Sequence, residues 1–122
     1  MLVVDDDPDL VPLLQAMLSA ENYTLLAAYN GKQGLALASS DHPDVILLDL
    51  LMPGMSGFEV LEELRADAET ADVPVIVLTA IDVTIGQREL LDKHVQGLVH
   101  KGAFTLQSLL AELRRLGGLV SP

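Results

Sequence analysis

Five polar residues, each placed directly after a short apolar run, carry the side chains needed to bind a cation or a phosphoryl group. They are Asp5, Asp6, Asp49, Thr79 and Lys101. The apolar runs before them cover residues 2–4, 45–48, 75–78 and 98–100 and read as β-strands. In an open parallel sheet, the carboxyl ends of the strands meet at one edge, and ligands bind there. We therefore expect three carboxylates, a hydroxyl and an ammonium group to share one pocket.

The three carboxylates predict a site for a hard divalent cation. Asp5, Asp6 and Asp49 would repel one another strongly unless a cation neutralises them or a proton is taken up. The chain has no cysteine, so a thiolate metal site is impossible. Mg²⁺ binds to one or two carboxylates and keeps water and phosphate oxygens as its other ligands. We predict Mg²⁺ here, with Mn²⁺ able to substitute for it.

Asp49 is the candidate nucleophile of this pocket. A carboxylate can attack phosphorus to form an acyl phosphate, as aspartyl-phosphate enzymes do. The hydroxyl of Thr79 could donate to a phosphoryl oxygen, and the ammonium group of Lys101 could pair with Asp49 and then with the phosphoryl group. Taken singly, each residue has an ordinary explanation: a turn aspartate, a β-branched strand end and an exposed lysine. Their shared position after strands favours a common site.

Composition limits the classes of protein to which the chain can belong. Its 122 residues are enough for one domain with a single core. The net charge of −11 argues against nucleic acid or an anionic membrane surface as a direct partner. No apolar run approaches the ~20 residues of a membrane span, and the start lacks a basic n-region, so we expect no signal peptide and a cytoplasmic location.

Strand-like and helix-like segments alternate along the chain, which is typical of an α/β domain with a parallel sheet. The expected strands cover 2–4, 23–27, 45–48, 73–78 and 98–100. The expected first helix begins after Asp7 as N-cap, with Pro8 in its first position. Its apolar stripe consists of Leu10, Leu13, Leu14, Met17 and Leu18. The other expected helices cover 31–39, 57–66, 84–93 and about 106–116. Ser56 and Glu59 have the spacing of a capping box before the 57–66 helix.

These residues give the chain a resemblance to the response-regulator receiver domain of two-component signalling, of the chemotaxis type. The matching motifs are Leu-Val-Val-Asp-Asp-Asp-Pro at 2–8, Asp-Leu-Leu-Met-Pro-Gly-Met-Ser-Gly at 49–57, Thr79-Ala80, and Lys101. The resemblance covers residues 1–122 as a single receiver domain. It implies a flavodoxin-like three-layer sandwich, in which a five-stranded parallel sheet of order 2-1-3-4-5 is flanked by five helices.

The resemblance also implies a role for each acidic residue. Asp49 corresponds to the phosphoacceptor of the family. Asp6 and Asp49 correspond to direct Mg²⁺ ligands, Asp5 acts mainly through water, and the backbone carbonyl of Leu51 is a further ligand.

The remaining motif residues correspond to the phosphoryl-binding part of the family's site. Thr79 and Lys101 would bind the phosphoryl oxygens, and Ala80 would leave room beside them. Such domains take the phosphoryl group from a phosphohistidine of a sensor histidine kinase or a histidine phosphotransfer protein, which then alters contacts with an output domain or target. They catalyse their own phosphorylation and dephosphorylation but turn over no external substrate in the usual sense.

Three departures from the family pattern lie near the fifth strand. Leu98 stands where Tyr or Phe is common, Gly102 stands where Pro usually follows the lysine, and His94-Val95 replaces the usual Gly-Ala. We hypothesise that this domain does not signal through the usual aromatic-coupled dimerisation. Apolar Leu51 and Ile81 flank the expected phosphoryl site and should orient an attacking water poorly, which predicts a fairly stable acyl phosphate.

Two other functions stay open at this point. The first is a metal-dependent hydrolase with an aspartyl-phosphate intermediate, although Leu51 occupies the position of the acid/base carboxylate that such enzymes place two residues after the nucleophile. The second is a degenerate receiver that serves only as a docking module. The chain could be a stand-alone receiver or part of a transcription regulator or hybrid sensor kinase, and the departures near Lys101 favour a hybrid kinase or a multi-domain relay protein by analogy.

Overall fold

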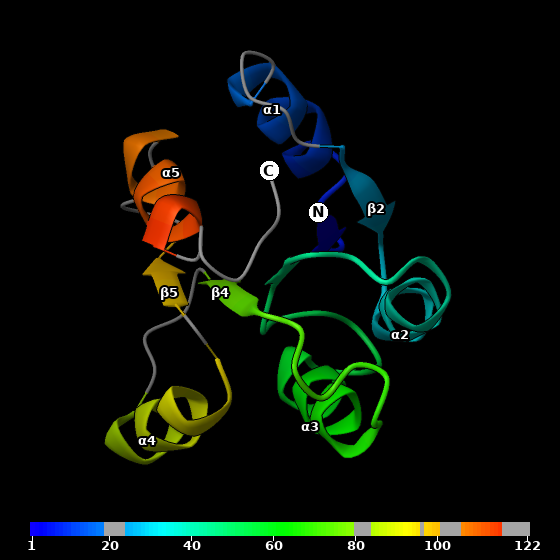
Figure 1. Cartoon of the computed structure of the whole chain (residues 1–122). Helices are drawn as coiled ribbons and strands as arrows, with labels where there is room; N and C mark the ends of the chain where they lie inside the picture. Colours follow the sequence, from blue (N-terminus) through cyan, green and yellow to red (C-terminus); the bar gives the residue numbers. More distant parts are fainter. Residues whose placement is uncertain (19–23, 80–83, 96, 101–105, 116–122) are drawn as a thin grey trace.

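A computed structural model describes residues 1–18, 24–79, 84–95, 97–100 and 106–115, and its strands and helices alternate along the chain (Figure 1). The strands are β1 (Leu2–Val4), β2 (Leu26–Ala28), β3 (Ile46–Leu48), β4 (Val75–Thr79) and β5 (Gly97–His100). The helices are α1 (Leu10–Met17), α2 (Gly31–Asp41), α3 (Gly57–Ala66), α4 (Ile85–His94) and α5 (Leu106–Arg115). Among the described helices, none has the length and apolar character needed to cross a bilayer.

The strands form one parallel sheet in the order β2-β1-β3-β4-β5, which confirms the predicted topology. The register pairs Val4 with Leu48 and Leu48 with Val77. The carboxyl ends of β1, β3 and β4 therefore lie side by side. β1 and β3 are wholly apolar and buried, as expected for central strands covered on both faces.

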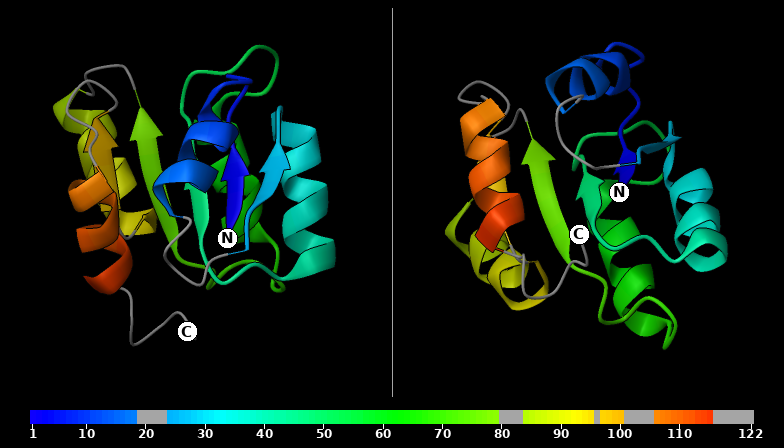
Figure 2. Two further views of the ribbon diagram at one scale, coloured as in Figure 1. Left: turned by 90° about the horizontal axis from the view of Figure 1, so that it is seen from above. Right: turned by 45° about the horizontal axis from the view of Figure 1, so that its top comes forward.

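Helices cover both faces of the sheet, so the fold has the three layers that the resemblance implied. α1 and α5 lie on one face, and α2, α3 and α4 lie on the other (Figures 1 and 2). Alternate strand residues supply the two cores. Val3 and Leu47 join the cluster on the α1/α5 side, whereas Leu2 and Leu48 join the cluster on the other side.

Local capping interactions fix where two helices on the second face begin. The Ser56 hydroxyl accepts a hydrogen bond from the Glu59 amide at 3.3 Å, and α3 spans the predicted residues. The start of α4 is fixed by a reciprocal pair, in which the Gln87 amide donates to the Thr84 hydroxyl at 3.1 Å and the Thr84 amide donates to the Gln87 side chain at 3.0 Å. This capping box explains why a helix forms there despite its weak apolar pattern.

The start of α1 differs from the sequence prediction. The N-cap is Asp9, and the helix begins at Leu10. Asp7 lies two residues before this N-cap, where its Oδ1 accepts a hydrogen bond from the amide of Asp9 at 2.9 Å and its carbonyl accepts one from the amide of Leu10 at 3.4 Å, in a turn that leads into the helix. The buried face of α1 includes Val11, whereas Leu13, which the predicted stripe included, is 48% exposed. Other boundaries differ from prediction by a few residues at most.

Candidate functional site

Three carboxylates come together at the carboxyl edge of the sheet. Asp5 and Asp6 follow β1, and Asp49 follows the neighbouring strand β3. A carboxylate oxygen from each of the three lies within 4.8 Å of those from the other two. Asp5 and Asp49 are only 1% and 4% exposed, whereas Asp6 is exposed to solvent. The structure thus assembles the acidic cluster that the spacing predicted.

Backbone hydrogen bonds hold two of these aspartates in the sheet. The amide of Asp5 donates to the carbonyl of Ala28 at 3.0 Å, and the amide of Asp49 donates to the carbonyl of Val4 at 2.9 Å. The Asp5 Oδ1 atom also accepts a hydrogen bond from the amide of Asp7 at 2.9 Å. Because the parallel ladder continues one residue beyond the strand ends, both carboxylates project from rigid backbone.

The loop between β3 and α3 fixes the Asp49 side chain and depends on a glycine. The amide of Leu51 donates to Asp49 Oδ1 at 3.3 Å, and the amide of Gly57 donates to the carbonyl of Leu50 at 3.0 Å. A Cβ atom on Gly57 would overlap the backbone carbonyl oxygen of Asp49 and lie 2.6 Å from the Cα of Leu50. In the sequence, Gly57 is marked only as the start of a helix and as part of a motif. Its close approach to the Asp49 backbone becomes visible only in three dimensions.

Thr79 is the last residue of β4, the strand next to β3, and is 1% exposed. Its position places a hydroxyl at the same sheet edge as the acidic cluster. The strand β5 ends at His100, which pairs with Thr79, so the chain leading to Lys101 reaches that edge too. Lys101 itself and Ala80 lie outside the described residues, and their roles remain predictions.

The chemistry of this edge suits a divalent cation. Negative charges this close together repel one another, and a bound cation relieves that repulsion. All the donor atoms are oxygens, which hard cations prefer, and the exposure of Asp6 leaves the cluster accessible to water. The residues present therefore fit Mg²⁺.

A doubly wound sheet of order 2-1-3-4-5 with a carboxylate cluster at its carboxyl edge is typical of receivers of the chemotaxis type. Residues 1–114 match the model of the response regulator receiver domain, and the chain belongs to that family. It is therefore a receiver domain of two-component response regulators, a class of phosphoacceptor proteins.

Several characterised proteins are similar to the chain. It is 45% identical over 82 residues to protein PilH of Pseudomonas aeruginosa, covering 67% of this chain and 68% of PilH. It is 36% identical over 116 residues to the DNA-binding dual master transcriptional regulator RpaA of Synechocystis, covering 95% of this chain. Among solved structures, chemotaxis protein CheY4 of Vibrio cholerae superposes with a TM-score of 0.83 at 28% identity, covering 93% of this chain and 94% of CheY4.

Some of these relatives are much longer than the segment that matches this chain. The match covers 48% of RpaA and only 18% of the response regulator PleD of Caulobacter vibrioides, to which the chain is 49% identical over 82 residues. The comparison therefore concerns only the receiver part of those proteins. Activities of their other parts are not transferred to this chain.

Proposed function

We propose that Asp49 is the phosphoacceptor of this receiver and that it takes its phosphoryl group from a phosphohistidine of a sensor histidine kinase or a histidine phosphotransfer protein. The observation that carries the proposal is the cluster of Asp5, Asp6 and Asp49 at one sheet edge, beside the buried Thr79. Asp49 follows β3, the strand that lies between β1, which leads to the other two carboxylates, and β4, which ends at Thr79, and its side chain accepts a hydrogen bond from the amide of Leu51.

The reaction is a displacement at phosphorus. A carboxylate oxygen of Asp49 forms a bond to phosphorus, the bond between phosphorus and the imidazole nitrogen of the donor breaks, and the electron pair stays on that nitrogen. The amide of Leu51 holds the Asp49 carboxylate in place, and the Thr79 hydroxyl and the Lys101 ammonium group would stabilise the phosphoryl oxygens. Asp5, Asp6, Asp49 and the carbonyl of Leu51 would hold Mg²⁺, which, when bound, neutralises the charge that otherwise keeps a carboxylate and a phosphoryl group apart.

The side chain beside Asp49 supports a phosphoacceptor over a hydrolase. Receiver domains are generally non-catalytic phosphoacceptors. A hydrolase with an aspartyl intermediate needs an acid/base near the leaving group. The residue two positions after Asp49 is Leu51, whose side chain is apolar and 55% exposed. It has no proton to give or take.

The setting that we propose for this receiver is the cytoplasm, where a kinase or phosphotransfer partner supplies the phosphoryl group. The relatives include a transcription regulator with DNA-binding function, and an output of that or another kind could follow the receiver in the full-length protein. The strand β5 carries Leu98, which packs against the core cluster on the α2–α4 side, where the family commonly has an aromatic residue. Signalling without an aromatic-coupled dimer stays our prediction.

Intact-mass measurement after incubation with acetyl phosphate tests the proposal. We expect wild type to gain a single phosphoryl group in the presence of Mg²⁺ and none after chelation of the metal. Asp49→Ala should gain none. Asp41→Asn, which removes an exposed carboxylate at the end of α2, should be phosphorylated like wild type.

If Asp49→Ala still gained a phosphoryl group, the proposal would be contradicted, because another residue would then be the acceptor. If wild type gains no adduct from acetyl phosphate, the incubation is repeated with a phosphorylated histidine phosphotransfer domain. Failure with that donor as well would favour the docking module.

The acyl phosphate should be long-lived because the side chain of Leu51 cannot orient an attacking water. Replacing Leu51 with Asn should speed loss of the phosphoryl group by roughly tenfold, which is less than the ~10²–10⁴-fold effect of a dedicated general base. The rate is measured by removing the donor and following the loss of the phosphorylated species by mass spectrometry. Leu13→Asn changes a similarly exposed leucine on α1 and should leave the rate unchanged. Loss within seconds from wild type would contradict the prediction.

A further inference from the structure

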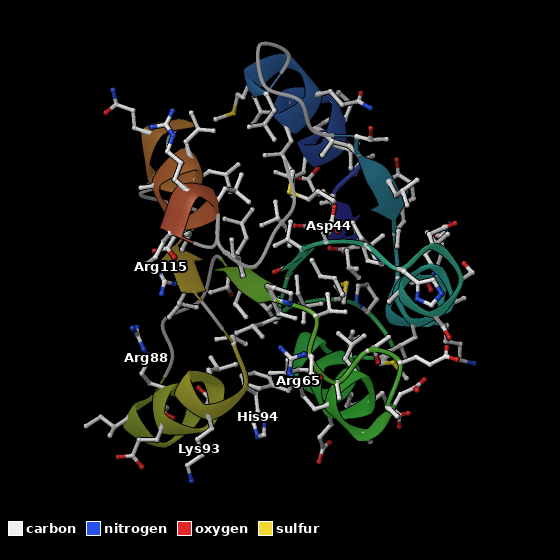
Figure 3. The ribbon with its side chains drawn as sticks, in the orientation of Figure 1. Asp44, Arg65, Arg88, Lys93, His94 and Arg115 are labelled. Atoms are coloured by element: carbon white, nitrogen blue, oxygen red, sulfur yellow. The ribbon has the colours of Figure 1, made fainter. Side chains whose placement is uncertain are left out.

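A cleft of about 310 Å³ lies between α3 and α4, on the face of the sheet that also carries α2. It is lined by Phe58, Leu61, Glu62, Arg65 and His94. Phe58 and Leu61 provide an apolar floor. Arg65 and His94 form a polar wall where the two helices end, and Figure 3 shows these two side chains between α3 and α4.

Arg65 builds the wall of this cleft. Its Nε and Nη2 atoms donate to the carbonyl of His94 at 3.0 and 2.7 Å, and its Nη1 atom donates to the carbonyls of Val73 and Ala71 at 2.8 and 3.0 Å. Burial lowers the pKa of the guanidinium, and nearby Asp72 partly offsets this effect. Because Val73 lies just before β4, the wall stands at the amino end of the strand, opposite the edge that carries Asp49.

The surroundings of the cleft carry an excess of negative charge. Between residues 57 and 73 the only basic residue is Arg65. The same segment has the exposed carboxylates Glu59, Glu62, Glu63, Asp67, Glu69 and Asp72. Of these carboxylates, Glu62 lines the cleft itself. On α4, the charged residues whose side chains the structure describes are Arg88, Glu89 and Lys93. A partner in the cleft would therefore meet an apolar floor and surroundings in which carboxylates outnumber basic groups.

We propose that this cleft binds a basic amphipathic helix of a protein partner. An amphipathic helix places apolar anchors at spacings of three and four residues into a groove, and its polar side can pair with charges at the rim. The anchors would contact Phe58 and Leu61, and lysine or arginine residues would face Glu62 and its acidic neighbours. A second copy of this chain is disfavoured as occupant, because it would bring another net charge of −11 to an acidic surface.

The polar wall of the cleft lies at the amino end of β4, whereas Phe58 lies at the start of α3, near the backbone of Asp49. None of the residues that line the cleft belongs to the acidic cluster. The helix is therefore expected to bind whether or not Asp49 is the phosphoacceptor. This independence means that failure of one proposal leaves the other standing.

Binding can be mapped by NMR on the isotope-labelled chain with a synthetic helical peptide that has leucines along one face and lysines elsewhere. Amide shift changes should concentrate in residues 58–65 and 91–95, and added salt should weaken the binding. A second peptide with glutamates in place of the lysines should cause none of these changes. Shift changes that spread over the whole acidic surface, or concentrate elsewhere, would overturn the proposal.

Two charge reversals separate a local effect from a global one. Glu62→Lys should weaken binding of the lysine peptide by roughly tenfold, since an attraction is replaced by a repulsion of similar size. Asp41→Lys makes the same change in net charge on α2 and should weaken binding less than about twofold. Equal weakening by both variants would show that only overall charge attracts the peptide, and the proposal would fail.

A third variant tests the apolar floor. Phe58→Ala leaves the charge unchanged and should abolish the mapped shift changes, with circular dichroism confirming that the variant is folded. If a folded Phe58→Ala protein bound the peptide as tightly as wild type, the proposal would be contradicted. It would also be contradicted if the amide shifts of the peptide-free wild-type chain in residues 58–65 and 91–95 changed with protein concentration, because a second copy would then occupy the cleft. If Phe58→Ala does not fold, the two charge reversals decide the question.

Discussion

Gly57→Ala should destabilise the domain by roughly 3 kcal/mol or more, at the upper end of the range for overpacked sites. The added Cβ atom would overlap the Asp49 carbonyl oxygen and lie 2.6 Å from the Leu50 Cα atom. These neighbours are backbone atoms of the loop that begins the site, so no side-chain rotation can relieve the overlap. Urea unfolding followed by circular dichroism measures the loss in the free energy of unfolding.

The same substitution should also slow phosphorylation. The loop can accept the Cβ atom only if the backbone at Asp49 moves, and that movement changes the position of its carboxylate. Mass spectrometry of the folded fraction, at a temperature below its unfolding transition, should show a lower rate of adduct formation with acetyl phosphate than in wild type. A folded variant that is phosphorylated at the wild-type rate would show that the loop tolerates a side chain at this position.

Gly86→Ala is the matched control. Gly86 lies in the first turn of α4, and a Cβ atom there would meet nothing within 4 Å. Alanine is favoured over glycine in helices by up to about 1 kcal/mol, so this variant should be as stable as wild type or slightly more stable. Equal destabilisation by the two alanine substitutions would mean that the close approach at Gly57 is not the cause.

The sheet and the acidic cluster could be predicted from the sequence because each depends on local order along the chain. A wholly apolar run such as 45–48 indicates a central strand, and the residue after it must lie at the carboxyl edge. The strand order, which sets β1 beside β3, was implied by the resemblance to the receiver family. Asp49 could therefore be placed beside Asp5 without any knowledge of the intervening helices.

Features that depend on competing local contacts or on distant partners could not be predicted in this way. Asp7 has the right side chain for an N-cap, but it uses that side chain in a turn with Asp9, and the helix begins later. Arg65 looks like one more charged residue on a helix surface. Its partners, the carbonyls of His94 and Val73, are 29 and 8 residues away in sequence, and nothing in the apolar pattern of α3 points to them.

Arg65→Met should lower the free energy of unfolding by about 2–4 kcal/mol, because hydrogen bonds from a charged donor contribute more than neutral ones and several are lost together. Methionine can replace the apolar stem of Arg65 but cannot donate to the carbonyls of His94, Val73 and Ala71. The lower part of the range applies if water reaches these part-buried carbonyls. For a domain of this size the melting temperature should fall by roughly 10 °C.

Two further variants identify the cause of this loss. Arg65→Lys keeps the charge but lacks the planar fork that reaches several carbonyls at once, so it should recover only part of the stability. Arg114→Met removes an exposed arginine near the end of α5 and should change stability by no more than about 0.5 kcal/mol. If Arg65→Lys were as stable as wild type, charge alone would explain the role of Arg65. If Arg65→Met were no less stable than Arg114→Met, the link from α3 to the end of α4 would contribute nothing measurable, because the carbonyls would be equally well satisfied by water.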